Sequence, residues 1–162
     1  MLTSFLLIEA LNISVHKYGV LYNLLIIGDG PEVGNLKIMA RKYKIEKYIH
    51  FSGEIYGKKV YEYLLSSDLC VIPGNVGLSA MHALSAGVPV ISHNNFDVQM
   101  PEHEAIIEGV TGSFYKELSV EDLVSKIHTW ILNPELLEKS KKNCLDIIKN
   151  KYSLSYQMKI LE

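Results

Sequence analysis

The stretch from Cys70 to His93, CVIPGNVGLSAMHALSAGVPVISH, decides the fold. Its first part is a short apolar run, typical of a buried strand, that ends at Pro73. A helix-like run with glycines at its start comes next, and a second apolar run follows Gly87. Strand, helix and strand in this order predict two parallel strands joined by a helical crossover.

The same alternation continues on both sides of this stretch. Short apolar runs predict strands at residues 22–28, 48–53, 68–73, 88–92 and 111–115. Helical spacing of apolar residues predicts helices at residues 6–18, 29–43, 57–67, 76–86, 119–132 and 135–152, with a short helical turn at 104–109 and a last short helix at 153–162.

These elements predict one α/β domain that spans residues 1–162. The strand candidates are apolar throughout, so both faces of the sheet are expected to be covered by helices. Right-handed crossovers then make the fold a doubly wound, parallel, Rossmann-like sheet. Ligands of such sheets bind outside the carboxyl ends of the strands, so the loops that follow the strands are expected to form the functional site.

Composition excludes several classes of partner and location. The net charge of -2 gives no basic field for nucleic acid. No apolar run approaches the roughly 18 residues that a membrane span needs, and the opening MLTSFLLIEALNIS lacks the positive start of a signal peptide. We therefore expect a cytoplasmic protein whose membrane contact, if any, is peripheral. Its two cysteines, Cys70 and Cys144, are expected to be reduced thiols.

The helix start after Pro73 carries the residues with the clearest chemistry. Asn75 is expected to cap the helix, and Gly74 and Gly77 would let a phosphate approach free backbone N–H groups closely. Asn75, Ser79 and His82 share one helix face and lean toward its start, so they are expected to face one site. The alternative is that the glycines only permit a tight turn and close packing, and that a neighbouring loop bonds His82.

The order of motifs along the chain resembles a known family. The motifs are IIGDGPE, YIHFSGEI, VYEYLLSSDLCVIPGNVGLSAMHALSAGVPVISH, EGVTGSF and DLVSKIHTWI, between about Leu2 and Leu132. This order resembles the C-terminal, donor-binding half of retaining glycosyltransferases with the GT-B fold (group 1, or family 4-like). The resemblance implies a UDP- or GDP-linked nucleotide-sugar as donor, a glycan or lipid-linked acceptor, and no metal or other cofactor.

The family motif E-G-F-G-L-x-x-x-E-A falls on Gly74 to Ala83. Gly77 and Leu78 match it, which implies backbone contacts to the donor sugar and diphosphate. Both glutamates of the motif are replaced, the first by Gly74 and the second by His82, which is expected to bond a ribose hydroxyl or a phosphate. The expected donor contacts are Gly74, Asn75, Val76, Gly77, Leu78, Ser79 and His82, and no catalytic residue is assigned.

Two further segments are assigned with the help of the resemblance. The segment that flanks the nucleobase in the family falls on His50, Phe51, Ser52 and Gly53. Glu102 and Glu104, in the loop after the strand expected at 88–92, are candidates for a sugar contact in place of the missing glutamate. The favoured alternative is that they form a solvated pair at a helix start. His82, His93 and His103 do not have the spacing of metal ligands, so no metal site is expected.

Two parts of the family pattern are missing from the sequence. They are the first strand, with its glycine-arginine turn and nearby lysine, and the N-terminal acceptor-binding domain. Arg41, Lys42 and Lys44 lie on a later helix and do not replace those cations. We therefore expect the isolated chain to be inactive, since the diphosphate lacks cationic partners and closure needs both domains. The missing strand also leaves an open edge, which makes a homodimer one expectation.

Two other functions compete with the transferase. The first is a non-catalytic module that binds a nucleotide or nucleotide-sugar, because both motif glutamates are replaced. The second is a sugar-nucleotide epimerase, which needs carboxylates as acid and base and is therefore disfavoured by Gly74 and His82.

Overall fold

The computed structural model describes residues 3–153, 156 and 158, so the helix expected at 153–162 lies mostly outside the described residues. Within them the strands are β1 (Leu24–Ile27), β2 (Ile49–Gly53), β3 (Cys70–Ile72), β4 (Val90–His93) and β5 (Gly112–Tyr115). The helices are α1 (Thr3–Tyr18), α2 (Val33–Lys42), α3 (Lys58–Leu65), α4 (Leu78–Ser85), α5 (Val120–Ile131) and α6 (Pro134–Ile147). Three short helical segments complete the described chain: η1 (Glu46–Tyr48), η2 (Pro101–Ala105) and η3 (Ile148–Tyr152).

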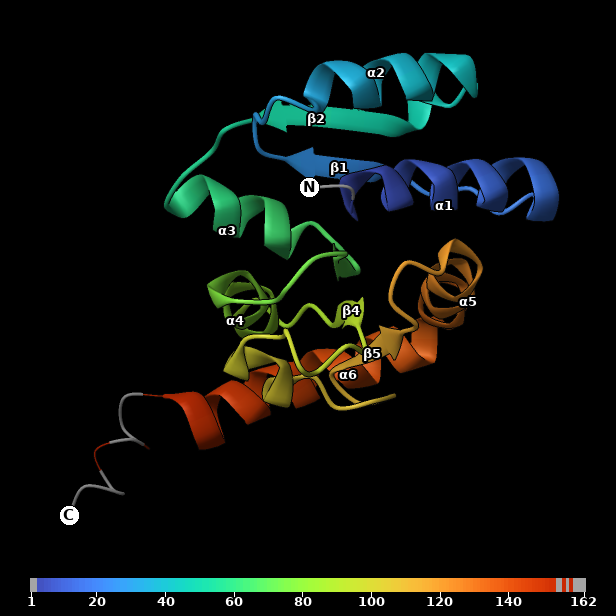
Figure 1. Ribbon diagram of the computed structural model, residues 1–162. Coiled ribbons are helices and arrows are strands. Elements are labelled where there is room, and N and C mark those ends of the chain that lie inside the picture. The colour runs from blue at the N-terminus through green and yellow to red at the C-terminus, as the bar shows by residue number, and fades with distance from the viewer. Residues whose placement is uncertain (1–2, 154–155, 157, 159–162) are drawn as a thin grey trace.

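The expected α/β fold with parallel strands is confirmed, but the strands pair in two groups instead of one sheet. β1 pairs only with β2, and the second group has the order β3-β4-β5; every pair of strands is parallel. We call these groups the β1–β2 half-sheet and the β3–β5 half-sheet (Figure 1). The division corrects the prediction of one continuous sheet, because no described strand joins β1 to β3.

Helices cover the β3–β5 half-sheet on both faces. On one face Ile72 and Val90 pack with residues of α3, α4 and α6. On the other face Val71, Ile91 and Tyr115 pack with residues of α1 and α5, among them the fully buried Trp130. Neighbouring strand residues point to opposite faces, so each face receives every second side chain.

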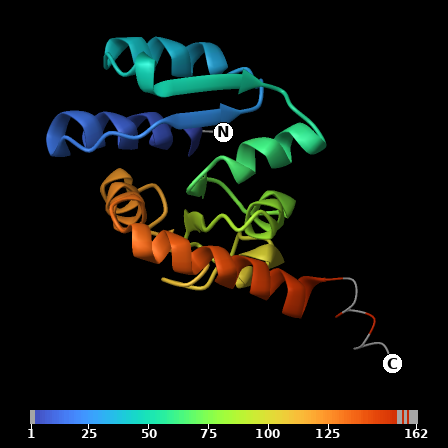
Figure 2. The same cartoon turned by 180° about the vertical axis from the view of Figure 1, so that it is seen from behind.

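Helix α1 packs against both half-sheets. Its Ile8 and Leu11 belong to a core cluster with Leu36 of α2 and with side chains of β1 and β2. Its Ala10 belongs to the cluster of the β3–β5 half-sheet, with Ile91. Figures 1 and 2 show α1 beside β1 with the β3–β5 half-sheet below it. One helix therefore holds the two groups of strands together.

Local sequence explains where the last helices begin. Ser119 caps α5 and accepts a hydrogen bond from the Asp122 backbone at 3.3 Å, as the spacing of the two residues predicts. Asn133 caps α6, with Pro134 in its first turn. The helical turn expected at 104–109 lies earlier, at Pro101–Ala105, because proline suits the first position of a helical turn.

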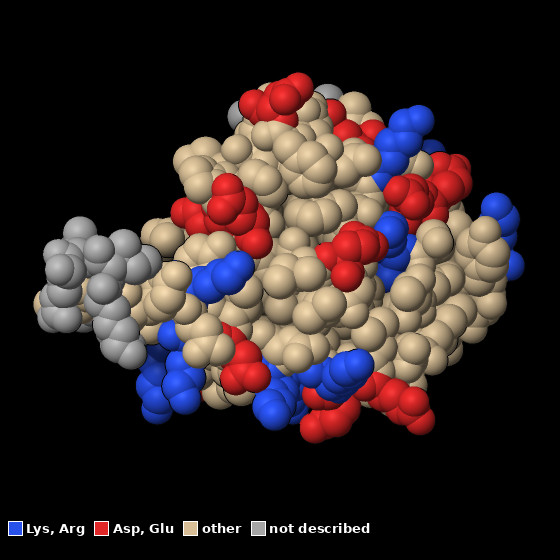
Figure 3. Space-filling view, turned by 90° about the horizontal axis from the view of Figure 1, so that it is seen from below, with Lys and Arg blue, Asp and Glu red and all other residues tan. Residues whose placement is uncertain are grey.

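The surface and the helix lengths add two observations. On the face shown in Figure 3, basic and acidic side chains are interspersed and form no field of one sign. None of the helices in the described part of the chain has the length and hydropathy to cross a membrane.

Candidate functional site

The start of α4 differs in one respect from the prediction. The helix begins at Leu78 and is preceded by Gly77, so Asn75 is not its cap, which corrects the sequence-based assignment. The Asn75 Oδ1 atom instead lies 3.1 Å from His93 Nε2. His93 Nδ1 accepts from the Asn95 backbone, so Nε2 carries the proton and donates to Asn75. Asn75 is thus held by β4 and not by the helix that it precedes.

The two glycines leave space at this helix start. A side-chain carbon added at Gly77 would meet nothing within 4 Å, and one added at Gly74 would meet only Thr3 Oγ1 at 3.5 Å, an ordinary contact. Neither glycine has a positive φ angle. Packing within the described chain therefore does not require glycine at either position.

The first turns of α4 present a polar stripe to solvent. Ser79 and His82 are exposed, as is Asn75 just before the helix, whereas Ala80 and Ala83 on the opposite side are fully buried. Among the described residues, none hydrogen-bonds the His82 ring. Leu78 is exposed as well, with 67% of its surface accessible. The stripe is thus open to a ligand, and the loop contact considered as the alternative for His82 does not occur.

Sequence reasoning missed Gln99, which occupies part of the helix start. Its Oε1 accepts from the Val76 backbone N–H at 2.8 Å, while its Nε2 donates to Ser92 Oγ and to the His93 carbonyl, both at 3.0 Å. Val76 is buried, so its expected donor contact is not open in this conformation. No sequence signal marks Gln99, because it lies in a polar loop 23 positions after its partner.

Thr3 is a second residue that the sequence did not reveal. As the first residue of α1, it lies next to Gly74. The amino end of α1 therefore lies beside the loop that leads from β3 to α4. Free N–H groups and the positive end of the helix dipole make such ends suitable for anions.

The predicted base-flanking segment lies in the other half-sheet (Figure 1). His50 is exposed, whereas Phe51 packs in the core cluster of β1 and β2. Ser52 Oγ donates to the Ile26 carbonyl, and the Gly53 carbonyl accepts from the Gly28 N–H at 2.9 Å. Backbone groups at the end of this segment are thus already engaged with β1 and the turn that follows it.

The two glutamates lie on η2, which packs against α4. Glu104 is exposed, while Glu102 is half-buried and its Oε2 atom is shielded from solvent with no hydrogen-bond partner among the described residues. His103, between them, stacks on Phe96 at 5.1 Å between ring centres. The structure therefore brings Glu102 and the α4 segment into one region and leaves a carboxylate oxygen without a donor.

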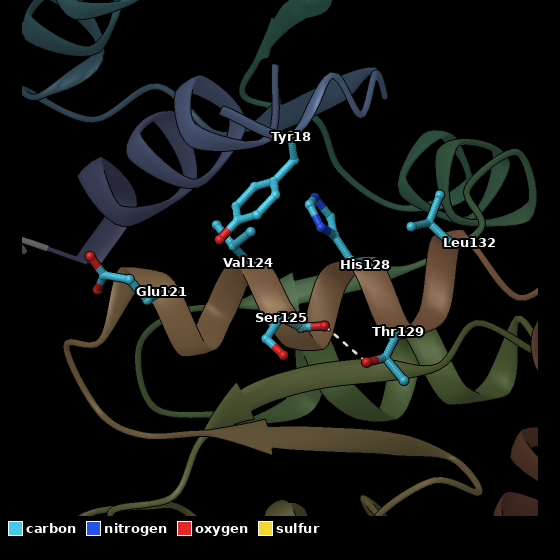
Figure 4. Close-up of a pocket in the computed structure, with 7 residues that line it drawn as sticks. All are labelled: Tyr18, Glu121, Val124, Ser125, His128, Thr129 and Leu132. Carbon is cyan, nitrogen blue, oxygen red and sulfur yellow. Dashed lines mark hydrogen bonds between the residues drawn. The ribbon is translucent and has the colours of Figure 1, made fainter. Parts of the chain in front are cut away.

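A hollow of about 410 Å³ lies elsewhere, between α1 and α5 (Figure 4). It is lined by Tyr18, Glu121, Val124, Ser125, His128, Thr129 and Leu132, none of which was predicted to bind a ligand. His128 Nε2 lies 2.9 Å from Ser14 Oγ, and burial lowers the pKa of the His128 ring. Because helix faces and not strand-end loops line this hollow, the start of α4 remains the candidate site.

The chain is an α/β domain whose candidate site lies where parallel strands end and helices begin. The family described as Glycosyl transferases group 1 matches residues 4–145. The chain belongs to this family.

Relatives of known sequence are longer than this chain. An uncharacterized glycosyltransferase of Haemophilus influenzae is 30% identical over 129 residues, which are 76% of this chain and 35% of that protein. The sulfoquinovosyl transferase of Arabidopsis thaliana is 30% identical over 117 residues, 69% of this chain and 22% of that protein. The chain therefore spans about a third, or less, of these relatives.

Solved structures share the fold at lower identity. The TarM protein of Staphylococcus aureus, solved with UDP, has a TM-score of 0.82 at 23% identity, over 98% of this chain and 32% of that chain. The C-terminal domain of a Francisella tularensis group 1 glycosyltransferase has a TM-score of 0.78 at 21% identity, over 93% of this chain and 80% of that chain. The chain thus has the fold of the C-terminal domain of GT-B glycosyltransferases.

Proposed function

We propose that the chain is the donor-binding part of a glycosyltransferase, which takes a UDP- or GDP-linked sugar and passes it to a glycan or lipid-linked acceptor. The family and the UDP-bound relative support this proposal. The observation that carries it is the open start of α4, where Gly74 and Gly77 leave room and His82 faces solvent.

Each part of the site has a role in this proposal. The amino ends of α1 and α4 bind the diphosphate and stabilise the charge that grows on it as the sugar departs. His82 replaces the second motif glutamate and bonds a ribose hydroxyl or a phosphate, while no side chain replaces the first at Gly74. Glu102 accepts from a sugar hydroxyl, which would satisfy its buried oxygen. The metal-free mechanism expected from the resemblance is part of the proposal.

Titration of the chain with UDP, GDP and ADP, and with their sugar-bearing forms, tests donor binding. We expect a preference for one base and tighter binding of a sugar-bearing form. The His82→Ala variant should weaken binding by about 1–3 kcal/mol if the ring makes a buried hydrogen bond to the donor. The control is His16→Ala, another exposed helix histidine, which lies near the far end of α1 from Thr3. Equal affinity of the His82 variant and the control contradicts the site.

A non-catalytic binding module is the second candidate function, favoured by the loss of both motif glutamates. Equal affinity for a nucleotide diphosphate and its sugar form would support the module. We also propose that these 162 residues alone do not transfer sugar, because they span only 35% and 22% of two relatives named as transferases. Turnover by this chain in a coupled assay for released nucleotide contradicts that part.

A further inference from the structure

We propose that the buried hydroxyls of Tyr115 and Ser92 are positioning groups for the donor site, because they orient the two peptide groups on either side of Gly74. In this orientation the N–H groups of Gly74 and Asn75 face an incoming phosphate. The inference rests on the proposed function and deepens it. Neither hydroxyl touches the donor, since each acts through a backbone carbonyl.

Both carbonyls beside Gly74 accept a hydrogen bond from a strand side chain. The Tyr115 hydroxyl, on β5, donates to the Pro73 carbonyl at 2.9 Å. The Ser92 hydroxyl, on β4, donates to the Gly74 carbonyl at 3.3 Å. The partners lie 42 and 18 positions apart in the sequence, so the fold and not the turn itself supplies these bonds.

These bonds determine where the neighbouring N–H groups point. A trans peptide group is planar, and its C=O and N–H point in opposite directions. No peptide bond in the described part of the chain is cis. The Gly74 N–H therefore points away from Tyr115. The Asn75 N–H likewise points away from Ser92. Because both side chains are fully buried, the two N–H groups are directed away from buried parts of the β3–β5 half-sheet.

The two N–H groups have no acceptor among the described residues. Between Gly74 and Ser79, the Val76 N–H alone has an acceptor in this part of the structure, and that acceptor is the Gln99 side chain. Unpaired N–H groups beside a helix start suit an anion. Their direction therefore decides whether a phosphate can use them.

Gly74 is the residue whose orientation most needs to be fixed. A glycine backbone has more accessible conformations than that of any other residue. Packing does not hold it, since an added side-chain carbon would meet only Thr3 Oγ1, at 3.5 Å. Tyr115 is suited to this task, because burial, with a smaller contribution from Glu117, raises the pKa of its hydroxyl to about 12. The hydroxyl therefore keeps its proton and remains a donor.

The test is a titration with UDP and GDP, followed in amide NMR spectra of the unchanged chain, Tyr115→Phe and Ser92→Ala. Tyr115→Phe keeps the buried ring and removes only the hydroxyl. We expect each variant to bind the nucleotide roughly tenfold more weakly, because a hydrogen bond to a charged phosphate is lost or misaligned. On addition of nucleotide, Tyr115→Phe should reduce the shift of the Gly74 amide signal most, and Ser92→Ala that of the Asn75 amide signal.

Two controls remove comparable hydrogen bonds away from this loop. Tyr61→Phe removes a tyrosine hydroxyl that donates to the Ser85 carbonyl, at the other end of α4. Ser113→Ala removes a buried serine hydroxyl that accepts from Trp130. Both controls should bind the nucleotides as the unchanged chain does, even though Ser113→Ala lowers the melting temperature.

The outcomes separate the positioning role from the proposed function. If the hydroxyls only satisfy their own hydrogen bonds in the core, Tyr115→Phe and Ser92→Ala lose stability but keep the affinity of the unchanged chain, and the positioning role is wrong. An equal loss of affinity in Ser113→Ala overturns it as well. If the unchanged chain binds neither nucleotide at millimolar concentration, the proposed function fails, and the positioning role fails with it. Should one of the two variants not fold, the other decides by the same comparison.

Discussion

The two half-sheets are built from similarly apolar strands, yet only one of them contains a fully buried strand. The β3–β5 half-sheet has helices on both faces, and its central strand β4 is inaccessible along its whole length. The β1–β2 half-sheet packs against α1 and α2, while Ile27 and His50 remain exposed. Strand composition therefore does not set burial by itself.

Matched leucine truncations should show the largest difference. Leu123 on α5 lies in the core of the β3–β5 half-sheet, with 0% of its surface accessible to solvent. Leu36 on α2 lies in the core of the β1–β2 half-sheet, with 2% accessible. We expect Leu123→Ala to cost roughly 4 kcal/mol and Leu36→Ala roughly 2 kcal/mol, because a site beside an open face relaxes more easily. Urea unfolding of both variants measures this. Equal losses would mean that the two cores are equally rigid.

Gly112 tests how closely β4 and β5 approach each other. A side-chain carbon at this position would overlap the Val90 carbonyl oxygen, which the neighbouring strand cannot move freely. We expect Gly112→Ala to cost about 3 kcal/mol in the free energy of unfolding. The matched control is Gly34→Ala within α2, where nothing lies within 4 Å; it should stabilise the chain by about 0.5–1 kcal/mol. A loss in the control as large as that at Gly112 would refute the packing argument.

A buried hydrogen bond gives a smaller effect in the β3–β5 half-sheet. Trp130 Nε1 donates to Ser113 Oγ at 2.9 Å, and both residues are buried. Ser113→Ala leaves the indole N–H without an acceptor and should cost about 1–3 kcal/mol. The control is Ser66→Ala, which removes an exposed hydrogen bond from the Ser66 hydroxyl to the Tyr63 carbonyl. It should change the free energy of unfolding by less than about 0.5 kcal/mol. Thermal melting of the two variants compares them.

The smallest effect is expected where α1 meets the β3–β5 half-sheet. Burial lowers the pKa of His128 below its ordinary 6.5, so the folded chain holds the ring neutral while the unfolded chain takes up a proton as the pH falls. The neutral His128 ring makes its full contribution to the free energy of unfolding above pH 6.5. This contribution is lost as the pH falls through the pKa that His128 has in the folded chain. Glu121 and Tyr18 face the same hollow as His128.

Melting temperatures at pH 7.5 and 5.5 measure this loss. His128→Gln should reduce the decrease between the two pH values. Thr129→Val changes the next residue of α5 and removes no titrating group. This variant should show the same decrease in melting temperature between the two pH values as the unchanged chain. If the glutamine variant loses as much stability as the unchanged chain, His128 does not contribute to the pH dependence.

Most secondary structure was predictable, because hydrophobic periodicity is local. Leu123, Ile127 and Trp130 follow the helical repeat, and all three are buried on α5 as predicted. The α4 segment was also found, although its start was placed too early. Asn75 has the side chain of a cap, and only the distant His93 determines that it bonds elsewhere.

The parts that sequence did not predict depend on neighbours in space. Gln99 and Thr3 reach the candidate site from a loop and from another helix, and neither carries a pattern that reveals it. The two separate half-sheets were likewise missed, because LLII is the same string whether one or two strands lie beside it. The ligand roles of His82, Glu102 and the base-flanking segment stay predictions.

The bond between Gln99 and the Val76 amide has a consequence for affinity. This glutamine already gives the amide what an incoming phosphate oxygen would offer, so the two compete for one hydrogen. An anion that replaces Gln99 at the Val76 N–H therefore gains only the difference in free energy between its own hydrogen bond and the one that Gln99 already makes. The same side chain donates from Nε2 to Ser92 Oγ and to the His93 carbonyl, so moving Gln99 away from the Val76 amide would also disturb its contacts with β4.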